Sequence, residues 1–507
     1  MLKRTSDAQR PDDNRPHAVI IGSGFGGLAA AVRLGARGYR VSVLEKLDAP
    51  GGRAYVFKEK GYVFDAGPTI ITVPFLLEEL WELAGRRFED DIEMKEMNPF
   101  YGIRFDDGDV VHCYRDANVM REEVRRISPS DVEGYERFLK KSKDIFEVGF
   151  KQLAHVPFHT LKSMVEVTPD LIRLESYRSV HALVSRYVKH PKLQVALNFH
   201  PLLVGGNPYA ASSFYCLISY LEREWGVHFV MGGTGKLVDG LVNLIEGQGG
   251  QVLCDQEVSQ ITTENGKATG VRLADGRQID ADIVVSNAEV GHTYKHLLSE
   301  TKRKRWTDSK VDNARYSMSL FLWYFGTKKQ YPDVDHHTII LGPRYRGLLN
   351  DIFNKKKLAD DFSLYLHRPT ASDPSMAPDG CEAFYVLSPV PNLKGDTDWE
   401  TAAEPYRQAV EKRLEETVLP GLKDNVDVSR VLTPIDFRDR LNSIDGAAFG
   451  LEPLLTQSAW FRAHNKCSDV EGLYLVGAGT HPGAGVPGVI SSARVLDAVV
   501  PDARVHG

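Results

Sequence analysis

Three closely spaced glycines near the start of the chain could bind a phosphate-rich ligand. Gly22, Gly24 and Gly27 fit the spacing G-x-G-x-x-G. In this pattern the first glycine permits a tight turn, the second lets backbone approach a pyrophosphate, and the third lets a helix lie close to a strand. Glu45 follows the first glycine by 23 residues, where a carboxylate can accept a hydrogen bond from a ribose hydroxyl. These residues together predict a dinucleotide-binding site.

The segments around these residues occur in the order that such a site needs. Residues 18–21 are apolar, as in a buried parallel strand, and residues 39–44 form a second β-branched run that ends at Glu45. Between them, residues 28–34 carry apolar side chains at helical spacing. The start of that helix would present free N–H groups and the positive end of its dipole to a phosphate. The ordered set is far more specific than the glycines alone.

The next loop distinguishes two dinucleotides, NAD and FAD. Pro50, Gly51, Gly52 and Arg53 follow the second strand closely. A loop of this kind in flavoproteins wraps the pyrophosphate, and its arginine adds positive charge. The sequence therefore favours FAD. No second G-x-G-x-x-G follows a strand, so we expect NAD(P)H to be neither the hydride acceptor nor a required reductant.

The length and the order of segments predict two interleaved domains. At 507 residues the chain exceeds the usual size of a single core. We predict an α/β fold in which a Rossmann-like FAD-binding domain is interleaved with an α+β substrate domain that faces a membrane. The predicted FAD-binding domain comprises residues 17–90, 230–290 and 460–507, the substrate domain comprises residues 91–229 and 291–459, and residues 1–16 are predicted to be a disordered leader.

Composition argues against several classes of protein. A net charge of −6, with 42% apolar and 26% charged residues, is typical of an ordinary folded protein and gives no support to a nucleic-acid partner. Five scattered cysteines without a CxxC spacing predict neither disulfides nor a metal site, and favour a reducing compartment. The polar N-terminus does not resemble a signal peptide, and no apolar run reaches the roughly 18–20 residues that span a bilayer. We expect peripheral contact with the cytoplasmic side of a membrane.

Seven motifs spread over nearly the whole chain follow one family pattern. They are GSGFGGLAAAVRL, EKLDAPGGRAYVF, FDAGPTIIT, LLVGGNPYAASSFY, LEREWGVHFVMGGTGKLVDGL, LTQSAWFRAHN and LYLVGAGTHPGAGVPGVISSA. The first is shared by very many flavoproteins, whereas the last motif and the EREWGV…GGTG stretch are much narrower. In this combination the chain resembles the bacterial-type phytoene desaturases of the amine-oxidase-like flavoprotein superfamily.

The resemblance implies non-covalent FAD in an amine-oxidase-like (GR2-type) fold, with roles for particular residues. The glycine turn, Glu45, Gly52 and Arg53 should contact the ADP portion, and Val258 should lie by the adenine. Gly479, Gly488 and Val489 should approach the ribityl chain or the isoalloxazine. Where many flavoproteins carry Gly-Asp after the last strand, this chain has Gly477-Ala478, as carotenoid desaturases do. The full predicted cofactor set is Gly22, Ser23, Gly24, Gly26, Gly27, Glu45, Lys46, Gly52, Arg53, Gly67, Pro68, Thr69, Val258, Gly479, Gly488 and Val489.

The resemblance also implies a substrate, a long acyclic isoprenoid hydrocarbon such as phytoene, taken from a membrane and converted to neurosporene or lycopene. Desaturation requires hydride loss from one carbon to the flavin and proton loss from its neighbour. A hydrocarbon offers nothing to hydrogen-bond, so its binding would depend on apolar burial, at roughly 25 cal/mol per Å². Oxygen or a quinone is the expected final electron acceptor. No catalytic base is assigned, because His200, His228 and His481 each suit a structural role as well.

Other functions stay open at this stage. One is desaturation of a related carotenoid or of a C30 diapophytoene. Another is FAD-dependent amine oxidation, although only Trp460-Phe461 stands where an aromatic pair would be needed. The third is a flavin-binding module without catalysis.

A basic segment suggests where a membrane would be contacted. Across residues 151–192 there are seven basic and three acidic residues, a local balance of +4 in an acidic chain. Apolar residues alternate with them, many at helical spacing, as in amphipathic helices that lie in a bilayer interface. The alternative is an ordinary pair of solvated helices packed on the core. The basic residues are Lys151, Lys162, Arg173, Arg178, Arg186, Lys189 and Lys192.

Overall fold

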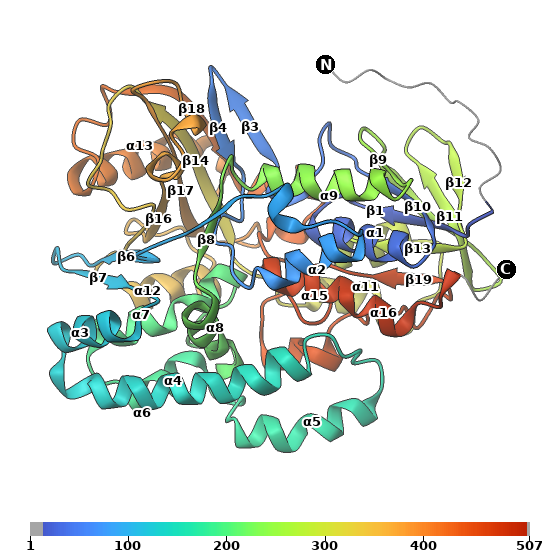
Figure 1. Ribbon diagram of the computed structural model, residues 1–507, viewed down its shortest axis with the longest axis horizontal. Coiled ribbons are helices and arrows are strands. Elements are labelled where there is room, and N and C mark those ends of the chain that lie inside the picture. Colours follow the sequence, from blue (N-terminus) through green and yellow to red (C-terminus); the bar gives the residue numbers. More distant parts are fainter. Residues whose placement is uncertain (1–13, 504–507) are drawn as a thin grey trace.

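The computed structural model describes residues 14–503, and most of the predicted leader lies outside this range. Three layers of structure are visible in Figure 1: a parallel sheet with its helices, a second and larger sheet, and a group of helices below that sheet. The chain passes between them several times. The two sheets take their strands from the segments predicted for the two domains, while the domain boundaries themselves stay a prediction.

The parallel sheet brings together strands from three distant parts of the chain, in the order β19-β13-β1-β2-β9. Its register places Ala18 opposite both Ile283 and Val41. Every residue of β1 is buried, as expected for a central parallel strand covered on both faces. The strands are β1 (His17–Ile21), β2 (Arg40–Leu44), β9 (Gln251–Leu253), β13 (Ile283–Ser286) and β19 (Leu473–Leu475).

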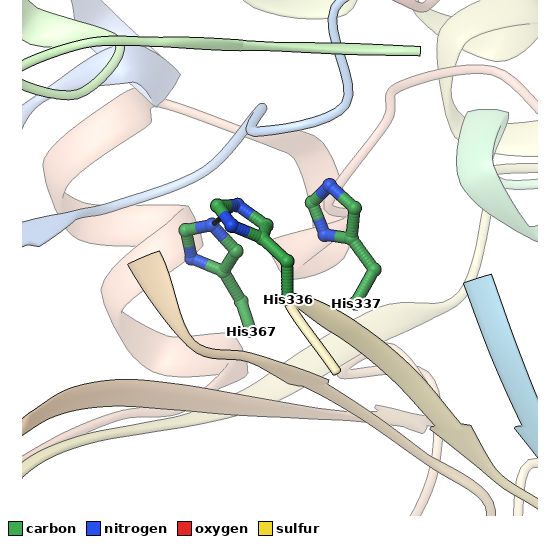
Figure 2. Close-up of side chains that lie close together, drawn as sticks. All are labelled: His336, His337 and His367. Carbon is green, nitrogen blue, oxygen red and sulfur yellow. Dashed lines mark hydrogen bonds between the residues drawn. The ribbon is translucent and has the colours of Figure 1, made fainter. Parts of the chain in front are cut away.

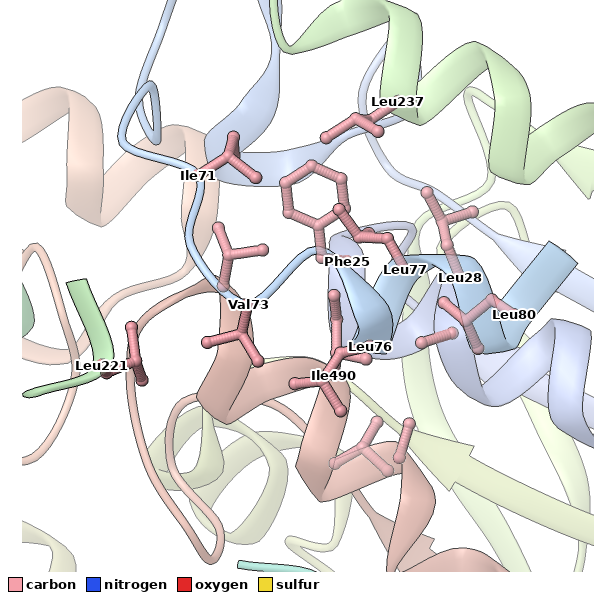
Figure 3. Packing of buried hydrophobic residues seen from close by; sticks show 14 of the residues in the cluster. Phe25, Leu28, Ile71, Val73, Leu76, Leu77, Leu80, Leu221, Leu237 and Ile490 are labelled. Carbon is pink, nitrogen blue, oxygen red and sulfur yellow. The ribbon is translucent and has the colours of Figure 1, made fainter. Parts of the chain in front are cut away.

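Helices cover one face of the parallel sheet and a small antiparallel sheet covers the other. Helix α1 (Phe25–Ala36) packs between α9 (Gly235–Gly247) and α15 (Val486–Arg494), with α2 (Phe75–Leu83) against it. Figure 3 shows Phe25, Leu28, Leu77 and Leu80 in the resulting core. On the other face, Val19 and Ile21 share a core with the three-stranded sheet β10-β11-β12. The layers are those of a Rossmann-like fold.

The three-stranded sheet forms from two hairpins, as its turn residues predict. Its strands are β10 (Val258–Glu264), β11 (Lys267–Leu273) and β12 (Gln278–Asp280). Asn265 and Gly266 join the first two strands with φ of 50° and 80°, the left-handed conformations that a tight hairpin turn requires. Gly276, in the second turn, has φ 90°.

The larger sheet has seven strands, in the order β18-β14-β17-β16-β15-β6-β7. Only β15 and β6 pair in parallel; the other neighbours are antiparallel. Strand β14, second from one edge of this sheet, alternates its side chains between two cores. Phe321, Trp323 and Phe325 pack towards α13, whereas Leu320 and Leu322 face a cavity. The strands are β6 (Tyr101–Arg104), β7 (Val110–Cys113), β14 (Ser319–Thr327), β15 (His337–Ile340), β16 (Leu364–His367), β17 (Glu382–Val390) and β18 (Val426–Leu432), and α13 is Trp399–Thr417.

A group of helices lies below the larger sheet (Figure 1), and α8 in this group lines the cavity. Helix α4 packs against both α6 and α8, and Figure 1 shows these helices running beneath the sheet. The group comprises α3 (Ala117–Ile127), α4 (Val132–Phe146), α5 (Leu161–Arg173), α6 (Val180–Tyr187), α7 (Pro191–Asn198) and α8 (Leu217–Trp225). The remaining longer elements are β3 (Val56–Glu59), β4 (Tyr62–Asp65), β5 (Met94–Glu96), β8 (His228–Val230), α10 (Val290–His292), α11 (Asp308–Asn313), α12 (Tyr345–Asn350), α14 (Pro434–Leu441) and α16 (Leu496–Val499).

The segment predicted to contact a membrane folds into two helices with different surroundings. Helix α6 buries Val180, Leu183 and Val184 in the core, which is the ordinary packed helix of the alternative reading. Helix α5 lies at the edge of the molecule (Figure 1), and none of its side chains that the structure describes is buried. Val165 and Ile172 are 63% and 62% exposed. Within residues 14–503, no helix is long and apolar enough to cross a membrane.

Ion pairs partly balance the positive charge of this segment, whose contact with a membrane stays a prediction. Six of its seven basic residues form ion pairs with carboxylates. Arg178 and Arg186 share Glu175, while Lys192 lies 2.6 Å from Asp107, far away in the sequence. Glu166, Asp170 and Glu175 already enter the balance of +4, whereas Glu147 and Asp107 lie outside the segment. The charge count within the segment therefore misses only the partners of Lys151 and Lys192.

Candidate active site

One cavity of about 520 Å³ joins the two sheets. At one end its wall is the turn after β1, the end of β2 and the loop that follows β2. At the other end its wall is the inner face of the seven-stranded sheet and the helices beneath that sheet. The carboxyl ends of the parallel strands thus open into the cavity, the usual place for a ligand in an open α/β sheet.

The glycine turn keeps one end of the cavity free of side chains. A Cβ on Gly27 would lie 2.1 Å from the carbonyl oxygen of Gly22, and one on Gly26 would lie 2.6 Å from Asn287 Oδ1. Gly27 is thus needed for close packing of α1 on the turn and does not line the cavity. Gly24 lines the cavity at the start of α1, where unpaired helical N–H groups attract anions.

Glu45 is fixed at the end of β2 by its neighbours. Its Oε2 accepts hydrogen bonds from Ser23 N at 2.9 Å and from Ser23 Oγ at 2.6 Å. Its Oε1 accepts one from Leu47 N at 3.0 Å. Glu45 is 5% exposed and lines the cavity. Its Oε2 already accepts two hydrogen bonds, so Oε1 is the oxygen that can accept a further one. Ser23, which does not line the cavity, holds this carboxylate in place.

The loop after β2 adds a cation to the same wall. Arg53 Nε donates to Ala448 O at 2.7 Å and Nη2 donates to Ser443 Oγ at 3.2 Å. Burial lowers the pKa of Arg53, and the charge of Glu289 partly opposes this effect. Lys46 also lines the cavity and is held by hydrogen bonds to α14 and Asn442.

Glu289 is a cavity residue that the sequence prediction missed. It follows β13, and burial raises its pKa to about 7. Oε2 accepts from His292 N at 3.2 Å, while Oε1 is buried without a hydrogen-bond partner. Its place just beyond a parallel strand was the available signal, because ligands gather at that edge of such sheets.

Hydroxyl groups line the middle of the cavity. Thr69 Oγ1 lies 2.7 Å from Tyr385 Oη and 3.1 Å from Tyr365 Oη, and Tyr385 donates to Gly67 O at 3.1 Å. Gly67, Pro68 and Thr69 all line the cavity. This network ties the segment after β4 to strands β16 and β17, so the two sheets meet here.

The last motif supplies a helix end to the same wall. Gly485 precedes α15 with φ 96°, and Gly488 and Val489 in its first turn line the cavity. Gly479 does not line it: a Cβ there would lie 2.4 Å from Val290 Cγ2, so this glycine is required for packing. The α15 N-terminus can favour an electron-rich group in the cavity.

The far end of the cavity is mostly apolar. Its side chains come from the seven-stranded sheet, from α8 and the turn before it, from the turn His200–Val204 after α7 and from α12, and a carboxylate, Glu222, lies among them. The apolar wall includes Phe199, Leu202, Leu203, Ile218, Leu221, Leu320, Leu322, Ile339, Leu341, Tyr345 and Leu387.

Comparison with known proteins agrees with this geometry. The family model described as flavin containing amine oxidoreductase matches residues 25–495. The chain is 49% identical to a neurosporene-forming phytoene desaturase of Cereibacter sphaeroides over 97% of this chain and 96% of the relative. It is 47% identical to a lycopene-forming phytoene desaturase of Pantoea ananas over 94% and 97%. The chain belongs to the flavin-containing amine oxidoreductases, in the group of the bacterial phytoene desaturases.

A solved structure supports the fold independently. An oxidoreductase from Methanosarcina mazei superposes with a TM-score of 0.64, covering 96% of this chain and 100% of that one, at 20% identity. The protein is therefore an oxidoreductase with FAD as cofactor, and the expected resemblance and fold class are confirmed.

The residues at the polar end fit FAD. The glycine turn leaves room for a pyrophosphate, Glu45 can accept from a ribose, and Arg53 is an adjacent cation. All of the predicted cofactor residues line the cavity except Ser23, Gly27 and Gly479, whose contacts are within the protein. Val258 lines the cavity beside Glu257. Which of these residues touches FAD stays a prediction.

The sequence analysis considered three histidines as catalytic bases: His200, His228 and His481. They lie in different places, and none of them lines the cavity. His200 Nε2 lies 3.0 Å from Glu222 Oε2. His481 Nε2 lies 2.7 Å from Leu153 O, and burial lowers the pKa of His481 to about 4. His228 is in β8, and burial lowers its pKa too. Only His200 contacts a group that faces the cavity.

A second group of histidines gathers at the start of β15 and the end of β16 (Figure 2). His336 and His367 lie with their Nε2 atoms 3.0 Å apart, and His337 Nδ1 lies 2.7 Å from Tyr365 Oη. Burial keeps all three neutral by lowering their pKa values. The rings of His337 and His367 are stacked at 18°, so their lone pairs do not converge on one point as metal ligands would. Hydrogen bonds and stacking hold these rings together, while His337 Nε2 and His367 Nδ1 are buried without a hydrogen-bond partner.

Proposed function

We propose that this protein catalyses the FAD-dependent desaturation of phytoene, forming neurosporene or lycopene. The observation that carries the proposal is a single cavity whose polar end fits a dinucleotide and whose other end is lined by aliphatic and aromatic side chains. A hydrocarbon needs such a wall, because apolar burial is its main source of binding free energy. The named activities of the relatives at 47–49% identity agree with this choice.

The residues of the chain divide the work of the reaction between the two ends of the cavity. Bound FAD supplies an acceptor for a hydride, which is chemistry that no side chain provides. The glycine turn, Glu45 and Arg53 would hold its ADP portion. The apolar wall would hold the hydrocarbon in one orientation and exclude water, so that a chosen C–H bond stays close to the acceptor.

The geometry favours a hydrocarbon over an amine as the substrate. The aromatic pair that an amine oxidase reading would use, Trp460-Phe461, does not line the cavity. Instead, the guanidinium of Arg305 lies 4.3 Å from the ring centroid of Trp460, and Phe461 is 38% exposed.

We further propose that α5 rests on a membrane surface. Val165 and Ile172 on α5 and Tyr177 just beyond it are at least 60% exposed, and α5 packs beside the turn that exposes Phe461. The π-helical turn Glu147–Gln152, which continues α4 and is linked to α5 by residues 153–160, contributes Gly149 and Phe150 to the cavity wall. An interfacial helix joined to that wall would bring a membrane-dissolved substrate close to the cavity. The reduced enzyme would pass its electrons to a quinone in the same membrane or to oxygen.

The activity can be tested with purified protein, FAD and phytoene in liposomes. Desaturation lengthens the conjugated system, so new visible absorption bands should appear and extraction should identify neurosporene or lycopene. Parallel reactions with diapophytoene and with simple amines test the alternatives, and anaerobic reactions with and without a quinone identify the acceptor. Oxidation of amines without conversion of phytoene would overturn the proposal.

A further inference from the structure

Glu222 is unusual among the carboxylates that line the cavity. The other four, Glu45, Glu257, Glu289 and Asp436, belong to the polar end. Glu222 is on α8, between the apolar side chains of Leu221 and its neighbours on the cavity wall, and is 5% exposed. A buried carboxylate in an apolar wall costs free energy unless its hydrogen bonds are satisfied. Its position thus invites a functional explanation.

Two hydrogen bonds orient this carboxylate. Tyr101 Oη on β6 donates to Oε1 at 2.5 Å, and His200 Nε2 lies 3.0 Å from Oε2. The side chains of His200 and Glu222 are each 6% exposed. Burial and the charge of Glu222 raise the pKa of Tyr101, so the phenol stays protonated as a donor. Each carboxylate oxygen uses one of its two accepting positions, and the second stays available to the cavity.

We propose that Glu222 is the catalytic base that takes the proton during desaturation, with His200 as the residue that positions it. This inference rests on the proposed function. In the step, the C–H bond of one substrate carbon breaks and its hydrogen leaves with both electrons to oxidised FAD. The C–H bond of the neighbouring carbon breaks and its hydrogen passes as a proton to the Glu222 carboxylate. The electron pair of that second bond forms the new C=C bond, so atoms and electrons balance.

The position of Glu222 suits this role better than that of any other ionisable group at the apolar end. A base must lie within hydrogen-bond reach of the proton that it takes, and a hydrocarbon substrate would occupy the apolar part of the cavity. His200 lies behind Glu222 and does not line the cavity. The phenols of Tyr365 and Tyr385 already share Thr69, and burial raises their pKa values.

A purely structural role is the competing explanation, because Glu222 also ties α8 to β6. Three variants separate the two. Glu222→Gln keeps the shape and removes the base, whereas Glu222→Asp keeps a carboxylate but withdraws it. Glu224→Gln is the matched control: Glu224 is on the same helix and also accepts from a tyrosine, Tyr220 Oη at 2.8 Å, but is exposed and does not line the cavity.

The experiment measures kcat and KM for phytoene, FAD content and melting temperature for each variant. We expect Glu222→Gln to lower kcat by roughly 100-fold or more with KM and FAD content unchanged. Glu222→Asp should recover part of the loss, and Glu224→Gln should behave as the wild type. Retention of more than a third of wild-type kcat by Glu222→Gln, with FAD bound, would overturn the role.

A second measurement decides the matter if Glu222→Gln does not fold. Phytoene carrying deuterium on the carbon that loses the proton should give a larger isotope effect in Glu222→Asp than in the wild type, because proton transfer has become slower. Deuterium on the hydride-losing carbon should show no comparable increase. An unchanged proton isotope effect contradicts the base role. A wild-type enzyme that forms no conjugated product overturns the proposed function, and the base role with it.

Discussion

The two ends of the cavity are built in opposite ways. The polar end is built around glycines and backbone from two short stretches near residues 22–27 and 45–53, to which the segments after β9 and β13 and helix α14 add the side chains of Glu257, Glu289 and Asp436. The apolar end consists of side chains from strands and helices that are far apart in the sequence. The first arrangement recognises a ligand of fixed shape and charge, and single atoms matter there. The second recognises only bulk and length, so its energy is spread over many contacts.

The strongest test of this contrast is a side chain in the polar end. Gly24→Val should abolish FAD binding, because the new side chain would enter the cavity beside Asn287, whose Nδ2 would lie 3.1 Å from the Cβ. The backbone of Gly24, with φ −66°, accepts a side chain without strain. The melting temperature of the FAD-free protein should therefore change little.

Flavin absorbance per protein after gel filtration measures this binding. Gly247→Val is the control, since a Cβ at Gly247 meets no atom within 4 Å. Stoichiometric FAD in Gly24→Val would show that the glycine turn is not the cofactor cradle.

Removal of the carboxylate at the end of β2 should have the next largest effect. Glu45→Ala loses the proposed acceptor for the ribose and also frees Ser23, so FAD affinity should fall by about 10- to 100-fold, as expected for lost hydrogen bonds to a charged group. Ser23→Ala removes the 2.6 Å hydroxyl contact with Glu45 and the acceptor of Gly51 N at 3.2 Å but keeps the carboxylate, and should cost less. Titration of FAD-free protein, followed by fluorescence, compares the two. Equal losses would contradict a direct role for Glu45.

At the apolar end, the corresponding test concerns α5. Val165→Ser together with Ile172→Ser should weaken binding to liposomes by roughly 30-fold, because about 2 kcal/mol of apolar insertion is lost. The flavin spectrum should not change. Val119→Ser on α3 is the control, since Val119 is also exposed, at 46%, but lies on another helix. Sedimentation with liposomes measures the effect, and undiminished sedimentation of the double variant would refute the membrane contact.

The smallest expected effect concerns Glu289 and pH. Because burial raises its pKa from 4.5 to about 7, the folded state favours the protonated carboxyl. Preferential protonation of Glu289 stabilises the folded state. The stabilisation is complete below about pH 4.5 and is lost as pH rises towards 7. Glu289→Gln removes the dependence. In FAD-free protein, the free energy of unfolding of the variant, relative to that of the wild type, should rise by about 1 kcal/mol as the pH increases between these limits. This value is smaller than the full pKa shift implies, because water in the cavity screens the charge.

Chemical denaturation at pH 4.5 and pH 8 tests this prediction. A constant stability difference between the two proteins at both values would show that Glu289 does not titrate in this range.

The sequence by itself predicted residues that gather at the polar end of the cavity, and it determined the family. Gly22, Gly24, Gly27 and Glu45 lie within one strand-turn-helix-strand unit, so their spacing along the chain already fixes their spacing in space. The hairpin at Asn265-Gly266 was predictable for the same reason, since its geometry depends on two adjacent residues. The narrower motifs carried the resemblance that the comparisons confirmed.

Only the tertiary structure decided what surrounds each charge and each cavity wall. It paired Lys192 with Asp107, a carboxylate from outside the segment 151–192. It also left Val165 and Ile172 of α5 exposed. It placed Glu222 between Tyr101 and His200, 121 and 22 residues away along the chain. Local spacing cannot specify such contacts, because they form when separate elements pack together, and that packing depends on the shape of the whole core.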